Sequence, residues 1–119
     1  MGTVGSSNFH RELELLGELH DKKQQDYGTE ADPFANVRAS EEFGIPAWLG
    51  CCVRMNDKVS RLKTYAKKGS LSNEGVEDTF RDLAVYSIIA LCLFKEQEYE
   101  QESAQRLEET EEWLEESVT

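Results

Sequence analysis

Two aspartates at the start of a long apolar stretch are the residues of this sequence best suited to chemistry. Asp78 and Asp82 are four positions apart, so on a helix they share one face. Residues 83–94, which follow, are almost entirely apolar, so we expect both carboxylates to be partly buried. A buried carboxylate must be paired, hydrogen-bonded or bound to a metal. Glu74, four positions before Asp78, is a further candidate metal ligand.

A basic stripe earlier in the chain offers the complementary charge. Arg54, Lys58 and Arg61 recur at helical spacing, with Asp57 among them. Guanidinium and ammonium groups bind phosphate oxygens, and carboxylates hold Mg²⁺, which is shared with substrate phosphates. If this stripe faces the two aspartates, the pocket between them predicts Mg²⁺–nucleotide recognition, and a water polarised by Mg²⁺ would attack a phosphoanhydride. The alternative is a structural ion network in which these bases only neutralise the aspartates.

A third group of charged residues precedes Gly28. Lys22, Lys23 and Asp26 lie at the end of the first predicted helix, from which they would reach a ligand beside the loop that follows. The alternative is a solvated helix end, where lysines are favoured by the helix dipole.

The elements that must position these groups are all helical. The apolar period and the breakers Gly28, Pro46, Gly69 and Gly75 predict main helices over residues 9–27, 47–68 and 76–94. A short helical piece is expected over residues 36–43. The fold class is therefore an all-α bundle of three to four main helices. We assign residues 1–8 to a flexible leader, residues 9–94 to the helical domain, and residues 95–119 to an acidic extension that continues the third helix or forms a fourth.

Composition limits the classes of function. The 119 residues carry a net charge of -11, which argues against binding to a nucleic-acid backbone. The acidic extension holds ten glutamates against Lys95 and Arg106. Three cysteines without CxxC spacing are typical of buried thiols in a reducing cytosol. No apolar run approaches the roughly 20 residues of a membrane span.

The candidate residues also carry a family resemblance over about residues 20–94. The chain contains a K–DYG–F element that includes Lys22, Lys23, Asp26 and Tyr27, an R–DK–RL element from Arg54 to Leu62, and an E–DT–DLA–Y element from Glu74 to Tyr86. These three linked elements resemble the phage and prophage family called nucleotide modification associated domain 1, which is similar to the MazG-like all-alpha NTP pyrophosphatases.

The resemblance implies a MazG-like bundle that forms a dimer or tetramer and acts on nucleotides in the bacterial cytoplasm. It implies catalytic roles for Asp57, Asp78 and Asp82, with Glu74 as a further Mg²⁺ ligand. Lys22, Lys23, Asp26, Tyr27, Arg54, Lys58 and Arg61 would then bind substrate. The chain departs from the MazG pattern of ExxE and ExxD, because Arg54 stands three positions before Asp57. With fewer acidic and more basic residues than the MazG pattern, the chain is expected to bind metal more weakly and phosphate more strongly than MazG-like enzymes.

Three functions follow as hypotheses. The first is Mg²⁺-dependent cleavage of a (deoxy)nucleoside triphosphate to the monophosphate and pyrophosphate. The second is a nucleotide-binding protein that sequesters its ligand, such as an immune signal, without turning it over. The third is an interaction protein whose acidic extension docks on a basic surface.

Overall fold

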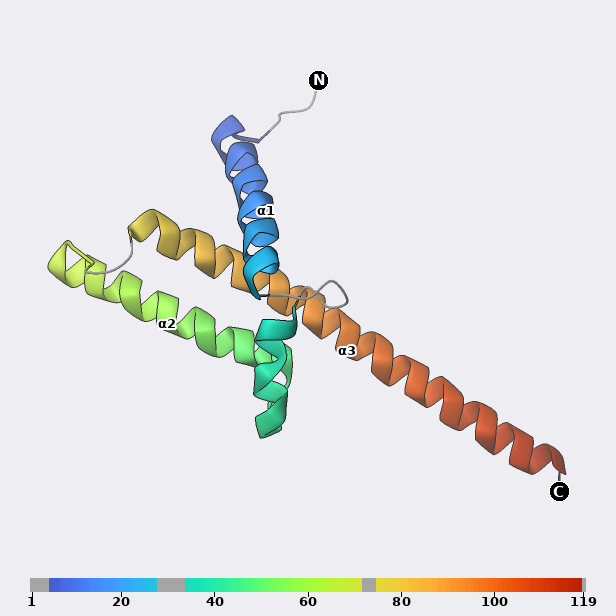
Figure 1. The fold of residues 1–119 in the computed structure, drawn as a ribbon. Coiled ribbons are helices and arrows are strands. Elements are labelled where there is room, and N and C mark those ends of the chain that lie inside the picture. Colours follow the sequence, from blue (N-terminus) through green and yellow to red (C-terminus); the bar gives the residue numbers. More distant parts are fainter. Residues whose placement is uncertain (1–4, 28–33, 72–74, 119) are drawn as a thin grey trace.

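The computed structural model consists of four helical segments (Figure 1). It describes residues 5–27, 34–71 and 75–118. The segments are α1 (Ser7–Tyr27), the 3₁₀ helix η1 (Ala35–Phe43), α2 (Ala47–Lys68) and α3 (Val76–Val118). The predicted all-α class and the bounds of α2 are confirmed, and the acidic extension continues the third helix.

The helix ends follow from local sequence. Gly44 ends η1 and Gly69 ends α2. Their φ values of 77° and 75° lie in the left-handed region, which residues with a Cβ rarely adopt. Pro46 precedes the first turn of α2 and needs no backbone N–H there. Glu77 and Asp78 lie in the first turn of α3, where the helix dipole favours negative charge.

The core is small and lies where α2, η1 and the middle of α3 meet. Ala47, Cys51 and Leu93 are buried together, and the partly buried hydrophobic side chains of Phe34, Val37, Trp48, Tyr86, Ile89 and Ala90 pack around them. An indole hydrogen bond of 2.8 Å from Trp48 Nε1 to Gln97 Oε1 ties the start of α2 to α3. These contacts hold the start of α2 against the middle of α3.

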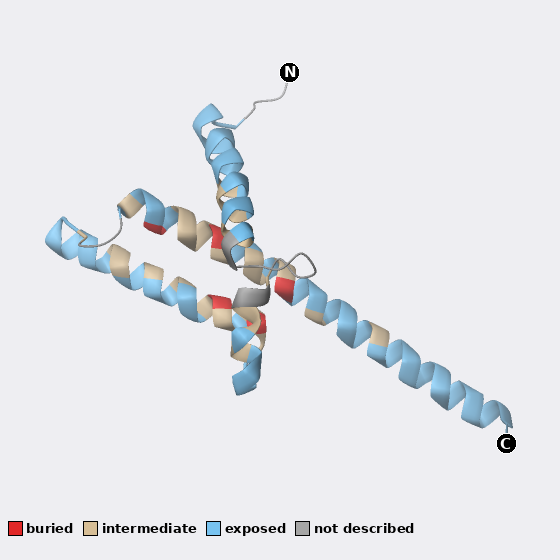
Figure 2. Ribbon diagram, viewed as in Figure 1, coloured by how far each residue is buried: buried red, intermediate tan, exposed pale blue. Residues whose placement is uncertain are grey.

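The molecule is elongated, and much apolar surface lies open. The radius of gyration is 20.1 Å, against roughly 14 Å for a compact domain of this length. In the described part of the chain, buried residues are few (Figure 2): Ala47, Cys51 and Leu93 lie at the junction, and Thr79 and Val85 lie further towards the start of α3. We expected the apolar stretch of the third helix to be enclosed, but Ile88 and Leu91 are 50% and 53% exposed. The reason is that α2 covers one side of α3 and α1 crosses it only locally.

Beyond the core, α3 projects alone. From about Gln97 to Val118 it extends away from the other helices (Figure 1). No helix in the described residues is both long enough and apolar enough to cross a membrane.

Candidate functional site

Asp82 is held between lysines from two other helices. Lys23 on α1 lies 2.9 Å from Asp82 Oδ1, and Lys58 on α2 lies 2.9 Å from Oδ2. The Asp82 side chain is only 14% exposed, whereas Lys58 is 19% and Lys23 is 41% exposed. Such partners offset the cost of holding a carboxylate in a partly buried position. The convergence of three helices on one acid forms the most concentrated charge cluster among the predicted site residues.

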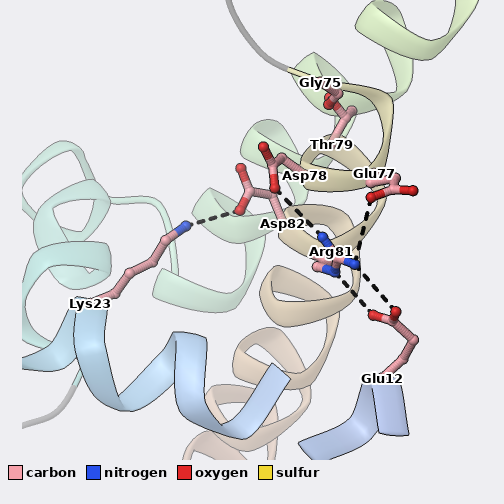
Figure 3. Close-up of polar contacts among 8 residues, drawn as sticks. All are labelled: Glu12, Lys23, Gly75, Glu77, Asp78, Thr79, Arg81 and Asp82. Carbon is pink, nitrogen blue, oxygen red and sulfur yellow. Dashed lines mark hydrogen bonds and ion pairs between the residues drawn. The ribbon is translucent and has the colours of Figure 1, made fainter. Parts of the chain in front are cut away.

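Asp78 does not share this environment. Its side chain is 68% exposed and lies 3.7 Å from Arg81 Nη1 on the same helix (Figure 3). The expectation that Asp78 is partly buried is therefore wrong. The inward position in this turn belongs to Thr79, which is fully buried and whose hydroxyl donates to the Gly75 carbonyl over 2.9 Å. One position along a helix rotates a side chain by about 100°, which turns Asp78 toward solvent.

Arg81 forms a second link between α1 and α3 that the sequence patterns did not indicate. Its guanidinium donates from Nε and Nη2 to the two Glu12 oxygens, at 3.0 and 3.2 Å (Figure 3). This hydrogen-bonded Arg81 lowers the pKa of Glu12, and the same bond to Glu12 raises the pKa of Arg81. On its own helix Arg81 also lies 3.8 Å from Glu77 and 3.7 Å from Asp78. Residue spacing along α3 carries no information on which other helix crosses at Arg81.

The basic stripe of α2 is divided between two places. Lys58 contacts Asp82, and Arg61, one turn further, is partly buried. Arg54 is exposed and lines a cavity of about 260 Å³ between η1, α2 and α3, together with Ser40 and Tyr86. Asp57 is exposed. Of this stripe, Lys58 therefore joins the Asp82 cluster directly.

Of the remaining candidate site residues, some lie within the described part of the chain and others lie outside it. Lys22 is exposed on α1, beside the Lys23 that binds Asp82. The backbones of Asp26 and Tyr27 complete α1, but their side chains lie outside the described residues. Glu74 also lies outside the described residues.

The described acids do not fit a resident Mg²⁺ by themselves. Both carboxylate oxygens of Asp82 are occupied by ammonium groups, and Asp78 faces solvent beside Arg81. Within residues 5–27, 34–71 and 75–118, no three histidine, cysteine or acidic side chains gather closely enough to hold a metal. Mg²⁺ prefers several oxygen ligands in near-octahedral geometry, and a carboxylate already bound to two cations is a poor contributor.

One of the three cysteines, Cys51, is part of the core, whereas Cys52 and Cys92 are half-buried. All three are free thiols, and Cys51 is fully buried against the core. Burial raises the pKa of the Cys51 thiol, with a smaller contribution from neighbouring Cys52. A protonated, inaccessible thiol is a weak nucleophile.

A further cavity lies away from this cluster. It measures about 490 Å³ and sits at the start of α2, where Arg38 binds Glu96 over 2.8 Å. Its lining combines Trp48 with several glutamates, a charge that disfavours phosphate.

Comparison of the chain with protein-family models, with curated proteins and with solved structures found no match. The resemblance to the phage nucleotide family, and the bacterial cytoplasm that it implies, therefore stay predictions from the sequence motifs.

Proposed function

We propose that this protein binds a phosphate-bearing small molecule, of the nucleotide class, at the junction of α1, α2 and α3. The observation that carries the proposal is the pair of lysines, Lys23 and Lys58, that converge at 2.9 Å on the single carboxylate of Asp82. Two ammonium groups brought together at one junction form a setting that attracts an anion such as a phosphate.

In this proposal Asp82 is a counter-ion that positions the lysines. Lysine side chains are flexible, and each loses conformational freedom when it is fixed at a ligand. The carboxylate holds both ammonium groups at the junction before the ligand arrives, so less freedom is lost on binding. Arg61, partly buried and one turn from Lys58, adds a guanidinium on the same face of α2.

Cleavage of the ligand is the competing proposal. It follows from the family resemblance, and Asp78 supports it because its exposed carboxylate lies one turn before Asp82 on α3. A metal brought in with the substrate phosphates would then need Asp82 as a ligand. The two proposals therefore assign opposite roles to the same side chain.

Asp82→Asn separates them. If Asp82 is a counter-ion, the amide oxygen of Asn still accepts a hydrogen bond from a lysine but no longer competes with the ligand as a charge, so affinity for a nucleoside triphosphate stays the same or rises. If Asp82 holds a metal, pyrophosphate release by the parent protein is abolished in the variant. Calorimetric titration with NTPs and dNTPs, with Mg²⁺ and with a chelator, gives the affinities, and a pyrophosphate assay gives turnover.

Matched lysine variants test the binding site. Lys58→Met is expected to weaken nucleotide binding about tenfold or more, because it removes a partly buried cation. Lys63→Met removes an exposed lysine of the same helix and is the control, with affinity unchanged. Equal affinities for the parent and for Lys58→Met would refute the proposed site.

We further propose that the protein is a homo-oligomer, as the resemblance implies. The support is apolar surface that a monomer of this shape leaves in water. Phe9 and Leu13 on α1 are 62% and 45% exposed, and Phe80, Ile88 and Leu91 on α3 are exposed to a similar degree. Large apolar side chains exposed in this number are typical of protein–protein contact surfaces.

A further inference from the structure

The projecting half of α3 has one face without glutamate. Between Tyr99 and Val118 there are eight glutamates. At about 100° per residue, these eight lie within an arc of about 200° with Glu100 at one edge, and the remaining arc holds none of them. The opposite side carries Ser103, Leu107, Thr110, Leu114 and Ser117, which we call the tail face, and it is flanked by Tyr99, Arg106 and Trp113.

The tail face continues the line along which α3 is packed within the chain. Steps of seven residues lead from Tyr86 and buried Leu93, through Glu100, to Leu107 and Leu114. The same steps lead from Ile89, through Glu96, to Ser103, Thr110 and Ser117. A seven-residue repeat is the pattern of helices that pack along their length. In the first half of α3 the partner is α2, whereas the second half has none in the described chain.

Large apolar side chains remain open on this half. Tyr99, Leu107 and Trp113 are 70%, 64% and 63% exposed, and Leu114 is 50% exposed. Two of the three hydroxyls of the tail face are already satisfied on their own helix. Thr110 donates to the Arg106 carbonyl and Ser117 to the Trp113 carbonyl, each over 2.8 Å. Both can therefore be covered by a partner without losing a hydrogen bond.

We propose that the tail faces of two copies of this chain pack against each other as an antiparallel helix pair. The sequence of the face is self-complementary about its midpoint between positions 108 and 109. In that register, Leu107 packs on Thr110 and Leu114 on Ser103 of the second copy, so a large side chain meets a small one in each layer. A two-fold axis repeats every such contact.

The flanks of the pair are also complementary. In an antiparallel pair the side of the face with Arg106 lies against the same side of the second copy. Arg106 of each chain then meets Trp113 of the other, an arrangement suited to cation–π contact. On the other side Ala104 meets Glu111, so glutamates of the two chains are not opposed.

A parallel pair conflicts with the fold. Because α3 is one continuous helix, a parallel partner would carry its own residues 76–97 alongside the first half of α3. The space beside the first half of α3 is taken by α2, which packs at Leu93, and by α1. Lys23 of α1 and Lys58 of α2 both contact Asp82 there. The antiparallel arrangement directs the body of each copy away from the other.

This pairing rests on the proposed homo-oligomer and does not depend on the proposed phosphate binding. A basic protein partner is the competing occupant, and salt separates the two. Two acidic helices repel, so raising the ionic strength strengthens self-pairing, whereas it weakens binding to a basic partner.

The first experiment measures the mass of the full chain by analytical ultracentrifugation. Leu107→Glu combined with Leu114→Glu is expected to raise the dissociation constant of the pair at least about tenfold. Gln101→Glu combined with Gln105→Glu adds the same charge on the glutamate side and is the control, with association unchanged. Equal association of both variants and the parent overturns the tail pairing. If Leu91→Glu nevertheless dissociates the protein, the general homo-oligomer survives.

The second experiment tests direction and register. Full-length Leu107→Cys and Thr110→Cys proteins are mixed and oxidised mildly, and the cross-linked peptides are identified by mass spectrometry. Antiparallel pairing predicts disulfides between position 107 of one variant and position 110 of the other. A parallel pair yields instead like-with-like disulfides, 107 to 107 and 110 to 110, and that result refutes the proposal. Native Cys51, Cys52 and Cys92 lie in other tryptic peptides and do not interfere.

Discussion

Lys23 on α1 and Asp82 on α3 are 59 positions apart in the chain, yet their charged groups meet at 2.9 Å. Together with the link between Glu12 and Arg81, this ion pair ties α1 to α3. Elsewhere between α1 and α3 lies a cavity of about 300 Å³ lined mainly by apolar side chains. The two polar contacts therefore help to attach α1 to α3.

The two lysines at Asp82 should differ in their contribution to stability. Lys58 is the less exposed, so Lys58→Met is expected to lower the free energy of unfolding by about 1–3 kcal/mol. Lys23→Met should cost less than about 1 kcal/mol, because solvent screens its 41% exposed side chain. Lys22→Met, on the exposed face beside it, is the control. Urea unfolding measures all three, and a Lys23 effect equal to that of Lys58 would contradict this ranking.

The core at the junction should respond differently from the open face of the same helix. Leu93 is 4% exposed, so Leu93→Ala is expected to cost about 2–4 kcal/mol in unfolding free energy. Leu91→Ala, at a 53% exposed position, should cost under about 1 kcal/mol in dilute protein. If a second copy covers Leu91, the cost of Leu91→Ala grows with protein concentration. A cost that is large and independent of concentration would show that Leu91 is buried within one chain.

The helices were predictable because their signals are local. Apolar period, Pro46 and Gly69 fix α2 at residues 47–68, as the structure confirms. Asp82 was predicted as partly buried from the apolar run that follows it, and it is. The same prediction was wrong for Asp78, because helix spacing groups residues by face but does not show how far a neighbouring helix covers that face. The contacts of Lys23 and of Glu12 depend on where α1 crosses α3, which is set by packing across distant segments.

The pair formed by Glu12 and Arg81 predicts an acid sensitivity. Arg81 lowers the pKa of Glu12, so the pair stabilises the fold at pH values above the ordinary glutamate pKa, and this stabilisation is lost as the pH falls through the lowered value. Glu12→Gln should therefore destabilise the protein at neutral pH and make little difference in strong acid. Urea unfolding of parent and variant across this range measures the effect. Exposed Glu14→Gln is the control, and a Glu12→Gln effect that persists in strong acid would contradict this origin.

Two glycines within helices should respond to alanine with opposite signs. A Cβ at Gly50 would lie 2.6 Å from Ser40 Oγ and 2.9 Å from Ser40 Cβ, so η1 must shift to admit it. A Cβ at Gly17 meets nothing within 4 Å. Alanine favours the helix over glycine by roughly 0.5–1 kcal/mol. Gly17→Ala is thus expected to raise the unfolding free energy by about that amount, and Gly50→Ala to lower it by about 1–3 kcal/mol.

A second substitution locates the cause at Gly50. Ser40→Gly removes both atoms that the new methyl would meet, so the double variant should recover part of the stability lost in Gly50→Ala. A thermodynamic cycle from urea unfolding of the two single variants and the double variant measures the coupling, which we expect to exceed about 0.5 kcal/mol for side chains in contact. Strictly additive effects would mean that η1 does not press on α2 at Gly50. Contacts other than the one between Ser40 and Gly50 would then have to hold η1 against α2 beside Cys51.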